Sequence, residues 1–332
     1  STKWASVNNW VIDIDIKNIV IKDITNNSIA WSSQVYTFGS SNGTLTAEWT
    51  EKTWDEYAAE SFAGGVGSPT DPYQISSPAE FALLAKQSKE NSIIGNYYKL
   101  TSNIDLSDHA WGGIGNINNP FNANFDGNLR CISNIRMKQG GNAGLFNVAY
   151  GATITQIILQ NGEIITTNDG IAGGIVGYAG TGYNTNNSTI TKCIVENVNI
   201  KSLDNTVGRV GGITGVNGAI SNCTFKNGRL EANCVGGICY YNSALDMGAC
   251  SVINATIIGK TSTNMIAYMT SYIKYCYGFG TLNGVENKLM YGAVITSWSR
   301  YWVCTNDING GYPVQRSFYW LLPREVKILM NT

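Results

Sequence analysis

The alternation of apolar and polar residues indicates β-structure over most of this chain. Near the N-terminus, WVIDIDIKNIVI (10–21) alternates with a period of two, and TLTAEWT (44–50) follows a glycine-containing turn. Both stretches are predicted to be strands, because this period directs alternate side chains to opposite faces of a sheet. We expect them to form either a small β-domain or extra coils at the start of a larger array.

One segment departs from this pattern and predicts a helix. SPAEFALLAKQSKE (77–90) carries apolar residues at helical spacing. Ser77 fits the N-cap, Pro78 fits the first helical position, and Glu80 completes a capping box. We expect this amphipathic helix to cap one end of the array, where strand edges and core would otherwise be exposed.

A glycine-rich element recurs along the middle of the chain. Its copies are NAGLFNVAYG (142–151), IAGGIVGYAG (171–180), RVGGITGVNG (209–218) and CVGGICYYN (234–242). Recurrence at irregular spacing is typical of a solenoid whose coils carry loops of different length. The stretch YAGTGYNTNNST (178–189) is interpreted as an inserted surface loop. The glycines are expected either to adopt positive φ or to let neighbouring coils approach closely.

A second element follows each glycine element and aligns without gaps. Its copies are TQIILQNGEI (155–164), TKCIVENVNI (191–200), SNCTFKNGRL (221–230) and GACSVINATI (248–257). Three columns recur in them: Ile157, Cys193, Cys223 and Cys250; Asn161, Asn197, Asn227 and Asn254; Ile164, Ile200, Leu230 and Ile257. Two shorter copies, LRCISNIRM (129–137) and KYCYGFGTL (274–282), place Cys131 and Cys276 in the first column. The pattern predicts stacked parallel strands with inward apolar columns and an asparagine ladder at a bend.

Composition narrows the class of partner. Hydrophobic residues make up 43% of the 332 residues, and charged residues only 14%, against roughly 25% in typical soluble domains. The net charge is −1 and no block of Lys or Arg occurs, which argues against nucleic acid or an anionic membrane as partner. No apolar run approaches the roughly 20 residues of a membrane span. No cofactor is implied.

The expected location is outside the cell. Polarity comes mainly from Asn, Ser, Thr and 37 Gly rather than from charge, which suits an extracellular or cell-surface protein. The chain begins STKWASVNNW without a hydrophobic signal core. A secreted protein whose targeting segment has been removed would look like this, and lipid anchoring through such a segment remains open.

The eight cysteines have a structural interpretation. Five of them share the apolar repeat position, so we expect buried free thiols that act as small hydrophobic residues. Disulfides remain the alternative. A metal site is not expected, because there is no CxxC pair and His109 is the only histidine. His109 is expected in a surface loop, and nearby Asp105 and Asp108 are expected to be solvated rather than to bind Ca²⁺.

These motifs resemble the bacterial GLUG-motif family. NAGLFN (142–147), AGGIVG (172–177) and VGGITG (210–215) match its repeat core. Four further segments resemble those that flank such repeats: FAGGVGSPTDPYQISSPAEFALLAKQ (62–87), YYKLTSNIDLS (97–107), PFNANFDGN (120–128) and NDINGGYPV (306–314). The resemblance covers roughly residues 62–315. It implies a parallel β-helix on adhesin-like surface or secreted proteins, and it implies no shared catalytic residues.

No pattern in the sequence predicts catalysis. Pectin hydrolases of β-helical fold carry Asn-Thr-Asp, Asp-Asp, Gly-His-Gly and Arg-Ile-Lys motifs, and none of these is present. Glycoside hydrolysis normally needs two carboxylates about 5–10 Å apart, and the repeat region is poor in acidic residues. Arg209, Arg229, Lys192 and Lys226 form no obvious cluster for a lyase. No catalytic residue is assigned.

Tyrosine clusters are the candidate binding residues. In AYMTSYIKYCYG (267–278), Tyr275 and Tyr277 should lie on one face of a strand, opposite Cys276. If Cys276 points inward, both rings face outward and could stack on a sugar or anchor a protein. The other candidates are Tyr240 and Tyr241 after the fourth glycine element, and Tyr178 and Tyr183 in the inserted loop. The alternative is that these rings cover a cap or a loop.

The whole-chain expectation is an all-β fold: a parallel β-helix, expected to be right-handed, with a short capping helix and β-rich terminal segments. A β-rich segment is expected over 1–60, a GLUG-type β-helix over 61–297 and cap strands over 298–332. The cap strands include SWSRYWV (297–303) and FYWLL (318–322). All nine Trp residues lie outside 112–297, which favours bulky caps.

The expected function is that of a non-enzymatic, adhesin-like protein at the cell surface or secreted. It would bind an extracellular glycan or a host or bacterial surface protein on the outer face or loops of the solenoid. Two alternatives remain, a polysaccharide-degrading lyase or hydrolase and a passive structural stalk.

Overall fold

The computed structural model describes residues 19–23, 28–29, 45–49, 52–91, 93–180, 187–274, 276–291, 302–303 and 314–315. The chain divides into two units, Ser1–Lys52 and Thr53–Thr332. In the first unit, β1 (Ile19–Asp23) pairs antiparallel with both β2 (Ser28–Ile29) and β3 (Leu45–Trp49). Strand β3 confirms the strand predicted over 44–50. Strand β1 contains the end of the stretch predicted over 10–21, whose first residues lie outside the described part. The boundaries expected at residues 60 and 297 stay predictions.

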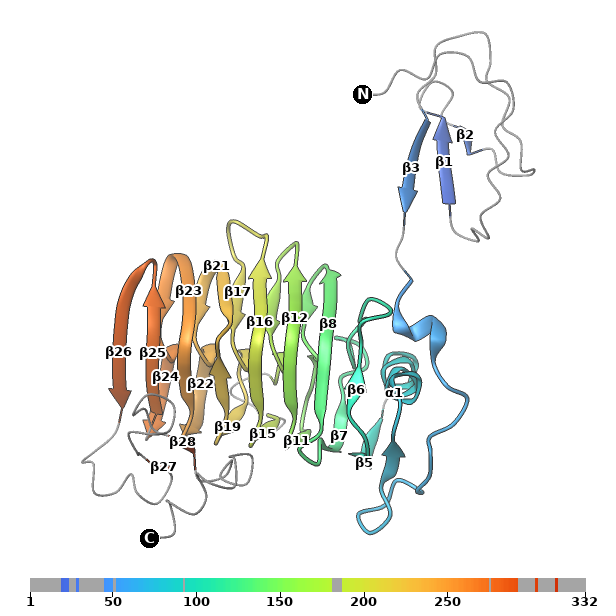
Figure 1. Cartoon of the computed structure of the whole chain (residues 1–332), viewed down its shortest axis with the longest axis horizontal. Coiled ribbons are helices and arrows are strands. Elements are labelled where there is room, and N and C mark those ends of the chain that lie inside the picture. The colour runs from blue at the N-terminus through green and yellow to red at the C-terminus, as the bar shows by residue number, and fades with distance from the viewer. Residues whose placement is uncertain are drawn as a thin grey trace, which may run out of the picture. The chain divides into compact units, whose positions relative to one another are not determined.

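The second unit is a parallel β-solenoid of about seven turns (Figure 1), which confirms the all-β parallel β-helix predicted from the repeats. Its first sheet contains, in hydrogen-bonded order, β10 (Phe146–Val148), β14 (Val176–Tyr178), β18 (Thr214–Val216), β22 (Cys239–Gly248), β19 (Ala219–Ser221), β15 (Thr189–Thr191), β11 (Thr153–Thr155), β7 (Asn122–Asp126), β5 (Ile94–Leu100) and β4 (Tyr73–Ile75), with β24 (Ala267–Lys274) beside β22.

The second sheet carries the longer strands. It contains, in the same kind of order, β6 (Ile104–Asp105), β8 (Cys131–Gln139), β12 (Ile158–Thr166), β16 (Ile194–Ser202), β20 (Thr224–Lys226), β23 (Ser251–Asn264), β21 (Arg229–Gly236), β17 (Arg209–Gly211), β13 (Ile171–Gly173) and β9 (Asn142–Ala143), with β25 (Cys276–Leu282) beside β23 and β26 (Val285–Tyr291) beside β25. Equivalent strands of successive coils lie side by side, so Ile158 pairs with Ile194 and Ala172 with Val210.

The predicted apolar columns point into the core. Ile157, Cys193, Cys223 and Cys250 are fully buried, and so are Ile164, Ile200, Leu230 and Ile257. Cys276 extends the first column, and its sulfur accepts a hydrogen bond from the backbone N–H of Cys250 (3.4 Å). The cysteines described here are free thiols, as expected from their shared repeat position.

Cys131 does not belong to this column, and that part of the alignment was wrong. Its register partner is Ile158, not Ile157, because the Asn bends of β8 and β12 are aligned and the shorter copy lacks one residue before its bend. Its side chain is half-buried on the outer side, where its thiol donates to the Gln160 side-chain oxygen (3.0 Å). Burial and the negative charge of Glu196 raise the pKa of this thiol.

The asparagine ladder occupies sharp bends in the backbone. Asn161, Asn197, Asn227 and Asn254 have φ of 60°, 55°, 54° and 51°, a left-handed conformation that Asn tolerates better than most residues. Asn197 donates to the Asn161 side-chain oxygen (3.4 Å), and Asn254 donates to that of Asn227 (3.1 Å). All four positions of the column need the left-handed conformation, whereas, in the part of the chain that the structure describes, the ladder hydrogen bonds join only two of the neighbouring pairs. Backbone conformation is therefore the main reason for asparagine at these positions.

The glycines in the middle of the glycine elements are explained by close approach rather than by positive φ, whereas the last glycine of three elements has φ of 65° (Gly151), 129° (Gly180) and 107° (Gly218). A β-carbon on Gly174 would lie 2.6 Å from the carbonyl oxygen of Gly212, and one on Gly212 would lie 2.3 Å from that of Gly237. A β-carbon on Gly237 would lie 1.9 Å from the carbonyl oxygen of Met265. Each coil thus rests directly on the next at this corner, and a side chain would separate them.

The helix α1 (Pro78–Glu90) begins as predicted. The Ser77 hydroxyl accepts from the backbone N–H of Glu80 (3.3 Å), and the Glu80 carboxylate accepts from that of Ser77 (3.1 Å). Phe81 stacks on Trp111 with ring centroids 4.6 Å apart and an interplanar angle of 5°. Both rings are buried in the core, so α1 covers the end of the solenoid that the first coils would otherwise expose.

The opposite end closes with an antiparallel hairpin. Strands β25 and β26 are joined at Asn283–Gly284, with φ of 49° and 84°, as in the two-residue turns that favour hairpins. Beyond it, β27 (Trp302–Val303) pairs antiparallel with β28 (Val314–Gln315), so part of the predicted strand over 297–303 is present. The strand predicted over 318–322 lies outside the described residues. None of the helices described is both long and apolar enough to cross a membrane.

Candidate ligand-binding site

A pocket lies beside α1 at the capped end of the solenoid. Its volume is about 470 Å³, within the roughly 300–1,000 Å³ typical of small-molecule sites. Its walls come from three parts of the chain, namely the segment 60–65, the helix α1, and strands β4 and β5 with the residue before β5. None of these parts would form the pocket alone.

The helix contributes one stripe of side chains. Leu83, Gln87 and Asn91 follow one another at intervals of four residues and all line the pocket, as expected for one face of a helix. Leu83 is buried, Gln87 is half-buried and Asn91 is exposed at the C-cap. The stripe therefore runs from an apolar floor to a polar rim.

The opposite wall is aromatic. Phe62, Tyr73 and Tyr98 pack on one another with ring centroids 5.0–5.7 Å apart. Tyr98 is only 2% exposed, and burial raises the pKa of its hydroxyl above the usual value. The Tyr98 hydroxyl accepts a hydrogen bond from the Asn96 amide (3.4 Å). The three rings form one aromatic cluster, in which Phe62 and Tyr73 are the more accessible members.

Backbone hydrogen bonds hold the chain around the pocket-lining segment 60–65 to α1, β4 and β5. Ala59 N donates to the carbonyl of Ala79 in α1, Ala63 N to that of Gln74, and Tyr97 N to that of Gly67. Gly67 has φ of 77°, and a β-carbon there would lie 2.3 Å from the Tyr73 ring. The loop therefore needs glycine at this position to lie on the ring, and the pocket is largely pre-formed.

The polar groups of the pocket keep unused hydrogen-bonding capacity. Within the described part of the chain, no hydrogen bond or ion pair joins the side chains of Glu60, Ser61, Gln87 or Asn91 to another residue. Of the lining residues that the structure describes, Glu60 is the one that carries a charge. The arrangement suits a ligand with several hydroxyl or amide groups and an apolar face.

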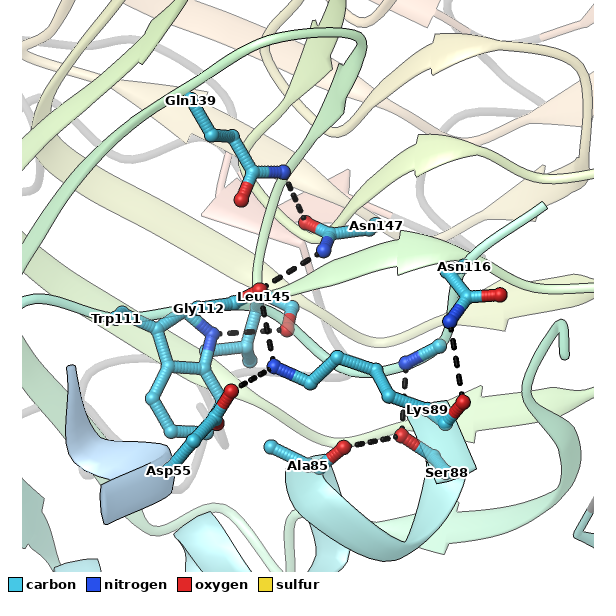
Figure 2. Close-up of polar contacts among 11 residues, drawn as sticks. Asp55, Ala85, Ser88, Lys89, Trp111, Gly112, Asn116, Gln139, Leu145 and Asn147 are labelled. Carbon is cyan, nitrogen blue, oxygen red and sulfur yellow. Dashed lines mark hydrogen bonds and ion pairs between the residues drawn. The ribbon is translucent and has the colours of Figure 1, made fainter. Parts of the chain in front are cut away.

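Polar contacts hold α1 in place behind this pocket (Figure 2). The Lys89 ammonium pairs with the Asp55 carboxylate and donates to the carbonyl of Gly112 (3.4 Å). The Ser88 hydroxyl donates to Ala85 in its own helix (2.8 Å) and accepts from Gly115 N (2.8 Å). Both charged and neutral groups therefore attach α1 to the rest of the unit. These contacts fix the position of the helix whose side chains line the pocket.

The tyrosines selected from the sequence do not form this pocket. Tyr275 and Tyr183 lie outside the described residues. Tyr277 is 1% exposed, so the expectation that its ring faces outward to solvent is wrong. Strand β25 has a neighbour on each edge, and Tyr277 lies between Ser251 of β23 and Met290 of β26. Its ring is buried although Tyr277 alternates with the inward Cys276.

Three other tyrosine candidates are half-buried on the solenoid. Tyr178 and Tyr241 fall in one column of the first sheet, separated by Val216. Tyr178 meets Tyr150 edge-on at 6.0 Å. For Tyr240, burial and then the Cys234 thiol raise the pKa of the hydroxyl. The fold therefore aligns two of the predicted rings, and their role in binding stays a prediction.

The region around His109 shows packing and capping rather than a reactive site. The imidazole stacks on Tyr57 with centroids 3.7 Å apart and lies edge-on to Trp54. Asp105 accepts from Asn134 (2.8 Å) and from Ser107 N (3.0 Å), and these bonds lower the pKa of its carboxyl. Among the residues that the structure describes, no group of three or more His, Cys, Asp or Glu converges as a metal site would require.

Sequence reasoning missed the pocket, although its parts were visible. The helix stripe Leu83–Gln87–Asn91 can be read from the spacing of four once the helix is assigned. The aromatic residues Phe62, Tyr73 and Tyr98 stand among small and neutral polar residues. Nothing in the sequence indicates that the three rings meet. Strand β4, the helix α1 and the start of β5 lie between Phe62 and Tyr98, and only the way these elements pack brings the rings together.

No protein-family model matches the chain, and no curated protein matches it. Among solved structures, the chain is similar to a candidate immunoglobulin A1 protease from Bacteroides ovatus. The TM-score is 0.51 and the sequence identity 17%, over 77% of this chain and 95% of that chain. At this identity the likeness shows the fold alone, and it agrees with the β-solenoid described above.

Proposed function

We propose that this chain is a non-enzymatic, adhesin-like binding protein that works outside the cell or on its surface. The observation that carries the proposal is the pre-formed pocket beside α1, which combines an aromatic wall with side-chain amides that have no partner of their own among the described residues. Concave sites with an apolar lining and a few placed polar groups are the usual form of ligand sites. The proposed ligand is an extracellular glycan or surface protein.

The chemistry of the pocket favours binding over hydrolysis. A glycosidase normally places two carboxylates about 5–10 Å apart around the scissile bond, whereas the described part of this lining contains one carboxylate, that of Glu60. His109 packs between two rings, and no hydrogen bond joins its imidazole to another described residue. A nucleophile activated by histidine would need such a bond.

The solenoid supports the proposal as a scaffold. Its coils are connected by register-matched strands and close glycine contacts, so a site at one end is held at a fixed position on a rigid body. The resemblance of the repeats to GLUG motifs is consistent with a surface protein of bacteria. The name of the structural neighbour raises proteolysis as an alternative, which the experiment below includes.

The test is a binding screen with cleavage controls. The purified chain is applied to an array of glycans and to host matrix proteins, and separate samples are incubated with polysaccharides and with immunoglobulin A1. We expect specific retention on the array and no new reducing ends or peptide fragments. Cleavage of either substrate would contradict the proposal, and retention of nothing would favour a structural stalk.

A further inference from the structure

We propose that the pocket beside α1 binds a neutral saccharide, with a sugar ring against the Tyr73 side of the aromatic wall and its hydroxyl groups hydrogen-bonded to Gln87 and Asn91. The inference rests on the proposed binding function and names the ligand class for that same pocket. Charge, hydrogen-bonding capacity and ring geometry each support it.

The charge of the pocket lining disfavours acidic ligands. Among the described residues that line the pocket, Glu60 is the one with a charged side chain, and none is Lys or Arg. Of the two lysines on α1, Lys89 is engaged with Asp55 and the Gly112 carbonyl, and Lys86 is not among the residues that line the pocket. A sialylated, sulfated or phosphorylated ligand would meet a carboxylate without a compensating positive group.

The amides match the chemistry of a sugar hydroxyl. Each side-chain amide offers two donors and one acceptor, and each hydroxyl both donates and accepts. Gln87 and Asn91 lie one helical turn apart on the same stripe, so they can address neighbouring hydroxyls of one ring. Within the described residues neither amide has a competing partner, so binding would break no internal hydrogen bond.

Ring geometry favours a sugar over an alkylammonium ion. A cation cage places several aromatic faces around one central space, with each ring centroid within about 6 Å of the bound charge. Here Tyr73 is tilted by 33° to Phe62 and by 34° to Tyr98, and neighbouring centroids are 5.0–5.4 Å apart. The rings therefore pack on one another without an enclosed centre, and the half-buried Phe62 and Tyr73 form the accessible part of this wall, because Tyr98 is only 2% exposed.

The experiment uses the full chain and defined probes. Neutral glycans ending in hexose or N-acetylhexosamine, sialylated and sulfated glycans, and a trimethyllysine peptide are compared on one array, and hits are quantified by calorimetry. We expect the neutral glycans to bind. The Gln87→Ala/Asn91→Ala double variant should bind them at least tenfold more weakly with an unchanged melting temperature. Lys86→Ala, an exposed change on the same helix outside the pocket, should bind as the parent does.

The aromatic wall is tested separately. Tyr73→Phe should keep most of the affinity, and Tyr73→Leu should lose at least tenfold because the ring is removed. Because Tyr73 also supports the loop at Gly67, a Tyr73→Leu chain that fails to fold leaves the amide variants to decide.

The outcomes separate the inference from the proposed function. Neutral-glycan binding that survives the amide variants would overturn the pocket assignment and leave the binding function in place. Binding of acidic glycans alone, or of the trimethyllysine peptide alone, would overturn the ligand class. Absence of binding to every probe and to the matrix proteins would remove the proposed function and the inference with it.

Discussion

Gly212 lies so close to Gly237 of the next coil that a β-carbon on Gly212 would be 2.3 Å from the Gly237 carbonyl oxygen. Neither residue has a positive φ, so backbone conformation does not require glycine here. Stacking of the coils requires it, because a methyl group would push apart two backbones that also hydrogen-bond through their neighbouring strands. The glycines at this corner of the coils are therefore packing positions of the solenoid.

Gly212→Ala should lower the free energy of unfolding by about 1–3 kcal/mol, the cost typical of overpacking a tight core. Gly140→Ala is the matched control, since a β-carbon there would meet only Thr167 Oγ1 at 3.5 Å without positive φ. Urea denaturation of both variants measures the difference. Equal effects at the two positions would contradict the close-contact explanation.

The asparagine bends can be separated into backbone and hydrogen-bond contributions. Asn227 has φ of 54° and accepts a hydrogen bond from Asn254. Asn227→Ala should cost about 1–2 kcal/mol or more, because alanine is disfavoured in the left-handed region. Asn227→Gly loses the same hydrogen bond but keeps the conformation, so it should cost clearly less. If the two variants are equally destabilised in chemical denaturation, the ladder hydrogen bond dominates instead.

The contact of Phe81 with Trp111 predicts how strongly the helix cap is attached. Removing a fully buried aromatic side chain typically costs about 3–5 kcal/mol, so Phe81→Ala should reduce stability by that order. Hydrogen exchange should then rise in α1 and in β5 before it rises in the middle coils. Lys86→Ala serves as the control on the same helix. A loss below about 1 kcal/mol would show that α1 contributes little to closing the end.

The buried thiols predict a loss of stability in alkali. Burial raises the pKa of Cys239 to about 12 from a usual value of 9.0. Between these two values the unfolded chain releases the thiol proton and the folded chain retains it. The stability contributed by the neutral thiol is therefore complete below pH 9 and falls by about 1.4 kcal/mol per pH unit above it.

Cys239→Ala should flatten this part of the pH profile, since it removes the titrating group. The measurement is urea denaturation of parent and variant from pH 8 to pH 10.5, and the difference between their slopes isolates Cys239 from other groups that titrate in alkali. Parallel profiles would argue against a buried neutral thiol. In the parent at pH 8, a thiol reagent should label Cys239 only on unfolding.

Most of the architecture could be predicted because it depends on short-range spacing. The spacing of Cys193, Asn197 and Ile200 determines which side chains point inward within one coil. Because the same spacing recurs in each repeat, equivalent side chains of successive coils stack on one another. The capping box at Ser77 is equally local. The register error at Cys131 shows the limit, because a one-residue deletion moves a side chain to the other face and only pairing with β12 reveals it.

The sequence by itself determined the solenoid, its inward columns, its asparagine bends and its capping helix, since each depends on residues within one repeat or one helical turn. Tertiary structure alone decided which surfaces are available. Tyr277 is buried although its alternation with Cys276 predicts an outward ring, and the pocket exists because Gln87 of α1 and Tyr73 of β4 line the same space. Such contacts join segments far apart in the chain, and no spacing within a single segment encodes their distance.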